Sequence, residues 1–335
     1  MSTVPNRVRK SVGRIRQLAA DLKRSFEGNE RLIEVMAACA VVHEPLLIIG
    51  EPGSGKTRMA YRFVELIGIR RGESNGFFEK CFHPYISLEA VFGPLSFSRL
   101  TGTPSEYVRL VEGYLPSARV AFLDDIFSAS PDFLLTLLSI VEDRVYQNGR
   151  ELYRSPLAGV LAACTGLPRA YRLRALANRL PIRAVSEEIS GPEMRARMLV
   201  KSNRLWLERS AGNGRESSCT FQDLTTCWEA CRLEVPDDFD QTAFGKAYVN
   251  CLDSVARHPG PIAEPNARTQ QKLLEVMRAL ALLRREDPEP TEAEIRLVEH
   301  IFTTPDARQE LTDELDQQGI PEWEYLPSGC TAPVA

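Results

Sequence analysis

The chain has 335 residues, enough for two domains with sizeable hydrophobic cores. Its formal net charge is −4, so no overall basic field indicates a nucleic-acid-binding protein. No apolar run approaches the ~20 residues that span a bilayer, and the N-terminus lacks the apolar segment of a signal peptide. We therefore expect a cytoplasmic protein without a membrane span.

A basic helix is predicted at the N-terminus, in the stretch NRVRKSVGRIRQLAADLKR. Val12, Ile15, Leu18 and Leu22 recur at helical spacing and give this helix one apolar face. A stretch this basic and this poor in acids also has the composition of a transit peptide. We favour an amphipathic helix that leads into the first domain.

Short apolar runs alternate with helical patterns up to about residue 189. Strands are predicted at 45–50, 119–125 and 158–165, with a further candidate at 179–185, and helices at 57–68 and 131–144. Strands that alternate with helices predict an α/β fold with a parallel sheet between helices. Residues 145–154 predict a tight hairpin, because Asn148-Gly149 suits a type I′ turn.

From about residue 190 the pattern is helical. Helices are predicted at 191–203, 221–235, 240–258, 266–285 and 291–302. We expect an α/β core over residues 1–189, a smaller all-α lid domain over 190–310 and a weakly ordered tail over 311–335.

The eight cysteines form no C-x-x-C pair and no dense framework. Cys227 and Cys231 stand four residues apart on a predicted helix, where they could form half of a metal site. The four histidines show no ligand spacing, so we favour reduced thiols without a bound transition metal.

GEPGSGKT, from Gly50 to Thr57, matches the phosphate-binding pattern G-x-x-x-x-G-K-[ST] between a predicted strand and a predicted helix. Backbone N–H groups of such a loop wrap phosphates, and the following helix adds its positive N-terminal end. The predicted nucleotide-binding residues are Gly50, Glu51, Pro52, Gly53, Ser54, Gly55, Lys56 and Thr57. Lys56 would reach the β and γ phosphates of ATP, and the Thr57 hydroxyl would bind Mg²⁺.

Asp124 follows four apolar residues directly, so it ends a buried strand. We expect that strand to lie next to the strand before the loop, which would bring the Asp124 carboxylate to the same Mg²⁺ as Thr57. Asp124 could instead cap a helix, a role that Asp125 and Ser128 suit better.

These motifs together resemble a MoxR-type AAA+ ATPase, closest to the RavA-like branch, over roughly residues 14–310. The most specific segments are VFGPLSFSRL and GYLPSARVAFLDDIFSASPDFLLTLLSIVEDRVYQNGR. In that family each of these segments contributes a hairpin that faces the central pore of a hexamer. The resemblance therefore implies a P-loop AAA+ core, a helical lid, a homo-hexamer and, often, a von Willebrand A-type (vWA) protein partner.

The resemblance also assigns three residues individually. Thr165 stands where the family has sensor 1, usually an asparagine that helps to hold the attacking water. Arg179 in ALANRLPIR corresponds to the arginine finger, which acts on the γ-phosphate of a neighbouring subunit. Arg268 in PNARTQQKLL corresponds to sensor 2. Arg179 could instead be one of a group of surface arginines with Arg169, Arg172, Arg174 and Arg183, and Arg268 an ordinary residue of a first helical turn.

Asp125 stands where the family has a catalytic glutamate that polarises the attacking water. Its side chain is one methylene shorter, which places the carboxylate about 1 Å further from that water, and misplacement on this scale can cost ~10²-fold in rate. Thr165 weakens the placement of the same water, so we expect real but slow hydrolysis with nucleotide binding intact.

Three functions remain open. The favoured one is an oligomeric, chaperone-like remodelling ATPase that acts on a protein partner. The second is a nucleotide-dependent switch or scaffold with little hydrolysis, which a single-turnover assay would distinguish. The third is a DNA-acting AAA+ protein, which only the basic N-terminal stretch and the arginines near Arg179 favour, and which a salt-dependent DNA titration would test.

Overall fold

The structure, a computed structural model, describes residues 4–69, 76–102, 105–167, 179–186, 191–210, 217–257, 266–300 and 305–327. Its first part contains α1 (Asn6–Ser25), α2 (Glu30–Val41), β1 (Leu46–Ile49), α3 (Lys56–Leu66), β2 (Phe77–Cys81), α4 (Glu89–Phe92), α5 (Phe97–Leu100), β3 (Val120–Asp124), α6 (Pro131–Asp143), β4 (Val145–Asn148), β5 (Glu151–Arg154), β6 (Gly159–Cys164) and β7 (Arg183–Val185). The second part contains α8 (Pro192–Ser210), α9 (Phe221–Cys231), α10 (Ala243–Arg257), α11 (Ala267–Arg285), α12 (Glu292–Ile295) and α13 (Pro305–Gln317). The described ranges also contain the 3₁₀ turns η1 (Leu115–Ser117), η2 (Ile126–Ser128), η3 (Phe239–Gln241) and η4 (Arg296–His300).

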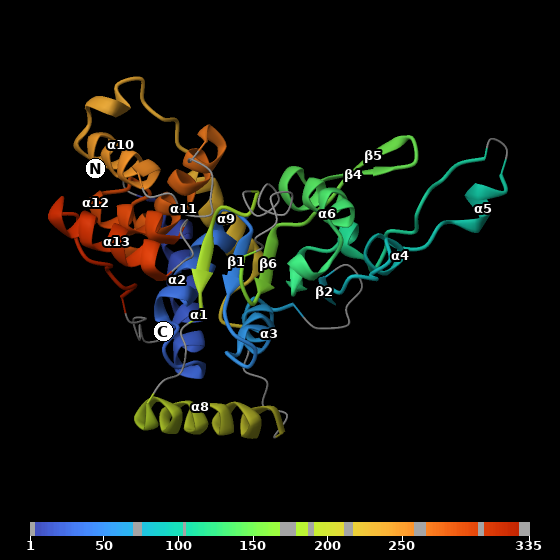
Figure 1. Ribbon diagram of the computed structural model, residues 1–335, viewed down its shortest axis with the longest axis horizontal. Helices are drawn as coiled ribbons and strands as arrows, with labels where there is room; N and C mark the ends of the chain where they lie inside the picture. Colours follow the sequence, from blue (N-terminus) through green and yellow to red (C-terminus); the bar gives the residue numbers. More distant parts are fainter. Residues whose placement is uncertain are drawn as a thin grey trace.

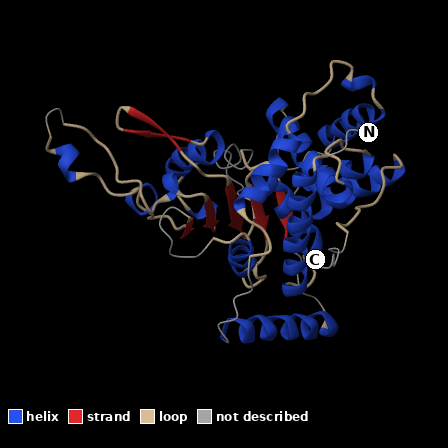
Figure 2. Cartoon of the chain, turned by 180° about the vertical axis from the view of Figure 1, so that it is seen from behind, coloured by secondary structure: helices blue, strands red, loops and turns tan. Residues whose placement is uncertain are grey.

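A five-stranded parallel sheet forms the centre of the molecule, in the order β2-β3-β6-β1-β7, and helices lie on both sides of it (Figure 2). The predicted α/β fold, with helices following in the C-terminal part, is confirmed. One expected neighbour is wrong: β6 lies between β1 and β3, so the strand that ends at Asp124 does not pair with the strand before the loop. Strand order is set by the path of the connections, which local hydrophobic patterns do not encode.

Alternate residues of each strand face opposite sides of the sheet and enter two hydrophobic clusters. Ile48 and Phe122 belong to the cluster that includes α1, α2, α3, α9 and α11. Leu47 and Leu123 belong to the other cluster, which α4 and α6 complete. The first cluster runs from the sheet into the C-terminal helices, so residues on both sides of the expected boundary at 189 share one core.

The basic N-terminal helix is part of this core. Val12, Ile15, Leu18 and Leu22 are each at most 1% exposed, as their spacing predicts. No helix in the described ranges is both long enough and apolar enough to cross a membrane.

Two segments project from the same side of the body (Figure 1). One is the arm of residues 89–102 and 105–114, which carries α4 and α5, and the other is the β4–β5 hairpin. The predicted hairpin is confirmed, but its turn is not: Asn148 pairs with Glu151, so Gly149 and Arg150 form the turn and only Gly149 has a positive φ (65°). The type I′ assignment on Asn148-Gly149 is therefore wrong, because the strand pairing extends one residue further than the turn pattern suggests.

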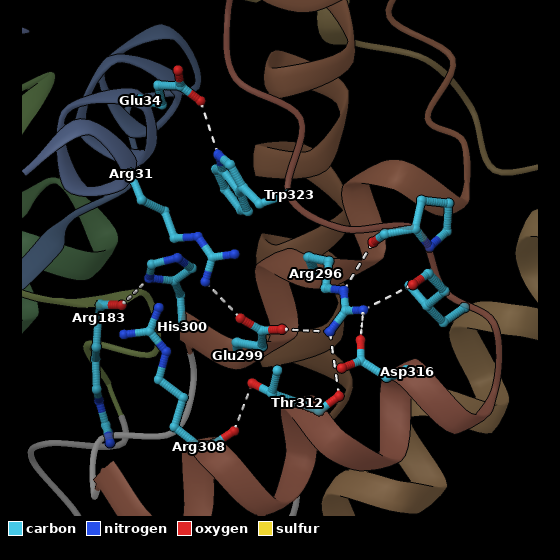
Figure 3. Close-up of polar contacts among 12 residues, drawn as sticks. Arg31, Glu34, Arg183, Arg296, Glu299, His300, Arg308, Thr312, Asp316 and Trp323 are labelled. Carbon is cyan, nitrogen blue, oxygen red and sulfur yellow. Dashed lines mark hydrogen bonds and ion pairs between the residues drawn. The ribbon is translucent and has the colours of Figure 1, made fainter.

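The expectation of a weakly ordered tail over 311–335 is wrong for residues 311–327. Helix α13 continues to Gln317, and Trp323 is 7% exposed. The Trp323 indole donates to Glu34 Oε2 at 3.0 Å, and the guanidinium of Arg31 lies 4.7 Å from its ring centre (Figure 3). The guanidinium of Arg284 also lies 4.7 Å from the ring centre of Trp323. Residues 318–327 have little local helical or strand pattern, and long-range contacts to α2 and α11 hold them instead.

The same region contains a chain of ion pairs around the buried side chains of Glu299 and Arg296. Glu299 bonds to Arg31 at 2.7 Å and to Arg296 at 3.0 Å, and Arg296 also pairs with Asp316 (Figure 3). The N-terminal α2 and the C-terminal α13 are thus joined through one network of charges.

Candidate functional site

A cavity of about 410 Å³ lies at the carboxyl ends of β1, β3 and β6. Ligands of open parallel sheets bind at this edge. The cavity is lined by Pro52, Gly53, Gly55, Lys56, Thr57, Arg58, Cys81, Asp124, Asp125, Cys164 and Thr165. It therefore brings the phosphate-binding motif together with three further residues that the sequence singles out, Asp124, Asp125 and Thr165.

The loop from Gly50 to Thr57 has the backbone that a phosphate cradle needs. Gly53 and Gly55 have φ of +87° and +88°, which side chains disfavour. Gly50 is required for a different reason, since a Cβ there would lie 2.9 Å from Ser186 Cβ beside β7. Helix α3 begins at Lys56, so its N-terminal N–H groups face the cavity end.

Lys56 lies folded into this loop. It is 7% exposed, and its Nζ donates to the backbone oxygens of Gly50 at 2.6 Å and of Glu51 at 2.9 Å. Ser54 stands 3.4 Å from the same Nζ. Among the described residues the ammonium group thus bonds to loop oxygens, which phosphate oxygens could replace.

Thr57 and Asp124 meet although β6 separates their strands. Thr57 Oγ1 donates to Asp124 Oδ2 at 3.0 Å. Mg²⁺ prefers oxygen ligands such as this hydroxyl and carboxylate. The other coordination positions of the ion would be left to phosphate oxygens and water. The residues present therefore fit the ion that the sequence predicts.

Asp125 has a left-handed backbone, with φ 51° and ψ 45°. Aspartate and asparagine tolerate this conformation better than residues with longer side chains do. Its Oδ2 accepts a hydrogen bond from Ser128 Oγ at 2.6 Å. It does not cap α6, because Ser130 Oγ accepts from the Phe133 N–H at the start of that helix. The capping alternative for Asp125 is therefore wrong for α6.

Thr165 directly follows β6 and is exposed at the cavity. Two thiols that no sequence motif singles out, Cys81 and Cys164, lie at the ends of β2 and β6. Burial raises the pKa of Cys164 to about 12, and burial together with the charges of Asp124 and Asp125 raises the pKa of Cys81. Both remain neutral thiols near pH 7 and add no charge that would repel phosphate. A sequence signal for Cys81 existed only in the strand FFEKC, which was not predicted.

Arg179 and Arg268 do not line this cavity. Both contact Glu142 at the C-terminal end of α6: Arg268 Nη1 bonds to Oε1, and Arg179 Nη1 lies 3.6 Å from Oε2. Their side chains are 60% and 43% exposed, whereas that of Glu142 is 4% exposed. The fold thus brings the two arginines together, but away from the nucleotide cavity of their own chain. Glu142 had no distinguishing feature in the sequence.

Arg183 does not belong to a surface cluster with Arg179. Arg183 is 1% exposed and donates to the Leu180 oxygen at 3.0 Å, so it belongs to the interior rather than to a basic surface. Arg169, Arg172 and Arg174 lie outside the described residues. Cys227 and Cys231 are buried in the helical core, and no group of three or more possible metal ligands occurs in the described part of the chain.

Comparison with known proteins identifies the family to which this chain belongs. Residues 13–224 match the family described as the MoxR domain in the MoxR-vWA-beta-propeller ternary systems. Two uncharacterized proteins of Methanocaldococcus jannaschii, MJ0079 and MJ0812, are 29% identical over 180 residues and 28% identical over 185 residues. These matches cover 54% and 55% of this chain but only 46% and 48% of the relatives, so the chain spans about half their length.

A solved structure has the same fold. A crystal structure of a protein from Cytophaga hutchinsonii ATCC 33406, named there a "putative ATPase", superposes with a TM-score of 0.59. The alignment covers 94% of this chain and 92% of that one at 12% sequence identity. At this identity the likeness concerns the fold alone.

Proposed function

We propose that this chain, which belongs to the family of MoxR domains in MoxR-vWA-beta-propeller ternary systems, binds ATP with Mg²⁺ and hydrolyses it within a ring of identical subunits. The observation that carries this proposal is the cavity that gathers the loop, Asp124, Asp125 and Thr165 at one edge of the sheet. Family membership and the fit of the loop to phosphates support ATP as the nucleotide.

Each residue of the cavity then has one task. Loop N–H groups and Lys56 bind the β and γ phosphates, and Lys56 exchanges the Gly50 and Glu51 oxygens for phosphate oxygens. Thr57 and Asp124 hold Mg²⁺, which when bound neutralises charge on the phosphates. Asp125 orients the attacking water and accepts its proton, and Thr165 provides a hydroxyl on the same side.

Hydrolysis in this proposal needs a second copy of the chain. Arg179 as the arginine finger and Arg268 as sensor 2 both lie outside their own cavity, on Glu142. Half-exposed guanidinium groups in this position are available to phosphates bound by a neighbour. A hexamer is the ring size that the RavA-like resemblance implies, and that finer assignment stays a prediction.

The work done by the ring is proposed to be remodelling of a protein partner. The family is defined by systems that also contain a vWA protein, and a partner of that type is therefore proposed here. The arm and the β4–β5 hairpin, which project together, are the segments proposed to transmit motion towards such a substrate (Figure 1).

One observation favours the alternative of a nucleotide-dependent switch. Ser128 holds one oxygen of the Asp125 carboxylate, which reduces the freedom of an already short side chain to reach the water. A switch would bind ATP tightly and release phosphate only over many minutes in a single-turnover assay.

The test is phosphate release per subunit as a function of protein concentration, with nucleotide binding measured separately. We expect turnover to rise as the ring assembles, and Lys56→Ala to lose ATP binding while keeping the fold, because Lys56 contributes charge to the phosphates rather than to a core. Arg179→Ala should bind ATP and turn it over poorly. Concentration-independent turnover, or wild-type affinity in Lys56→Ala, would contradict the proposal.

A further inference from the structure

The strongest unexplained feature outside the nucleotide cavity is the carboxylate of Glu142. Its side chain is 4% exposed and contacts two arginines that are far apart in the chain, Arg179 before β7 and Arg268 in the first turn of α11. Glu142 thus joins the α/β part of the chain to its C-terminal helices at one point.

The charges at this point explain why the two arginines can lie together. Guanidinium groups on either side of one carboxylate would repel each other without it, and the carboxylate would be costly to bury without them. Oε1 accepts a hydrogen bond from Arg268, while Oε2 accepts none from any described residue and faces Arg179 at 3.6 Å. Each arginine therefore uses only part of its five N–H donors on Glu142.

The remaining donors cannot serve the nucleotide of the same chain. Helix α6 starts close behind Asp125, and Glu142 lies about 17 Å further along its axis at 1.5 Å per residue. Neither arginine, nor Glu142, lines the nucleotide cavity. With 43% and 60% of their side chains exposed, the arginines face out of the subunit as a pair.

We propose that Glu142 is a positioning residue, whose buried carboxylate holds Arg179 and Arg268 as a pair for the phosphates bound by a neighbouring copy of this chain. This inference rests on the proposed function. It adds that finger and sensor act as one unit, because a single side chain sets the position of both. Glu142 itself touches no phosphate.

The primary variant is Glu142→Gln, which keeps the shape and removes the charge. Loss of the carboxylate lets the two guanidinium groups separate, and misplacement by about 1 Å is expected to lower turnover by about 10²-fold. ATP binding to the isolated subunit, measured with a fluorescent ATP analogue, should remain at the wild-type value. Glu142→Asp keeps the charge on a shorter side chain and should recover part of the turnover. Asp143→Asn is the matched control, since Asp143 is the exposed next residue of the same helix.

Mixing experiments separate positioning from a loss of stability. A Lys56→Ala subunit cannot bind ATP but carries an intact arginine pair, so its mixture with Glu142→Gln should turn over faster than either variant alone. A mixture of Glu142→Gln with Arg179→Ala should show no such gain, because both lack the same half of the site.

The outcomes are distinct. Wild-type turnover in Glu142→Gln, or a gain with Arg179→Ala equal to that with Lys56→Ala, overturns the role of Glu142 and leaves the ATPase proposal standing. If Glu142→Gln does not fold, Glu142→Asp decides the matter by the same two mixtures. A wild-type protein without turnover at any concentration overturns both proposals.

Discussion

Asp125 combines an unusual backbone conformation with a proposed role beside the attacking water. Its left-handed conformation favours aspartate over glutamate, which gives a local reason for the shorter acid at this position. The shorter side chain is expected to place its carboxylate further from the attacking water than a glutamate would. The Ser128 hydroxyl also holds one oxygen of this carboxylate, which limits the reach of the short side chain further.

At this scale we predict the effect of Asp125→Asn. An amide cannot accept the proton of the attacking water, so phosphate release should fall by at least about 10²-fold. ATP binding should be unchanged, because Lys56, Thr57 and Asp124 hold the phosphates and Mg²⁺ without Asp125. Steady-state phosphate release and separate nucleotide titrations measure the two effects.

Asp125→Glu provides the comparison. It restores the reach of the family's glutamate but introduces a side chain that fits the left-handed backbone less well, so we expect a gain in turnover only together with Thr165→Asn. Unchanged turnover in Asp125→Asn would remove Asp125 from the reaction.

At the scale of elements, the β4–β5 hairpin and the arm behave as one unit. Asn148 Oδ1 accepts from the Arg109 N–H at 2.7 Å, and Asn148 Nδ2 donates to the Arg109 oxygen at 3.1 Å. The turn lies close to the arm as well, since a Cβ on Gly149 would come within 3.1 Å of the Tyr107 oxygen. One amide therefore fastens the two projecting segments through the backbone of Arg109.

We predict that Asn148→Ala uncouples these segments. Losing two hydrogen bonds of about 1 kcal/mol each should speed hydrogen exchange in the arm around Arg109 by roughly tenfold or more. Nucleotide binding should not change. Gln147→Ala is the control, because Gln147 bonds only within the hairpin, to Gly149 and Glu151. Equal exchange rates at Arg109 in wild type and Asn148→Ala would show that the amide does not hold the arm.

At the scale of the whole molecule, buried neutral histidines join distant parts of the chain. His300 Nδ1 lies 3.0 Å from the Arg183 oxygen and donates to it, which leaves Nε2 buried and unprotonated. Burial, with the charges of Arg308 and Arg31, holds the pKa of His300 well below its usual value. Burial and Arg144 lower the pKa of His43 to about 4. Both rings are therefore neutral in the folded protein.

This arrangement predicts a loss of stability in acid. The unfolded chain binds a proton on each histidine as the pH falls through about 6.5, whereas the folded chain does not, so the free energy of unfolding decreases with falling pH. Between pH 6.5 and 4 we expect His43 alone to cost about 3 kcal/mol. Urea unfolding at several pH values measures how steeply the free energy of unfolding changes with pH.

His300→Gln should reduce that slope, whatever it does to stability at pH 7. His83→Gln serves as the control, because His83 is exposed. A slope that stays at the wild-type value in His300→Gln would show that His300 is not the titrating group.

Features that depend on neighbours along the chain could be predicted from the amino-acid sequence. The phosphate-binding loop, the apolar face of α1 and the alternation of strands and helices follow from local spacing, because backbone geometry repeats every two or 3.6 residues. The hairpin at residues 145–154 belongs to this group, although its turn lies one residue away from the predicted position.

Which of these features lie in contact with one another could not be predicted and follows from the three-dimensional fold. β6 separates β1 from β3, yet Thr57 still reaches Asp124 across it. Residues 142 and 268 meet over 126 positions of the chain, and Trp323 packs on α2 from a segment with no pattern of its own. Such contacts depend on strand order and on buried charges finding partners in three dimensions, and neither is encoded in local periodicity.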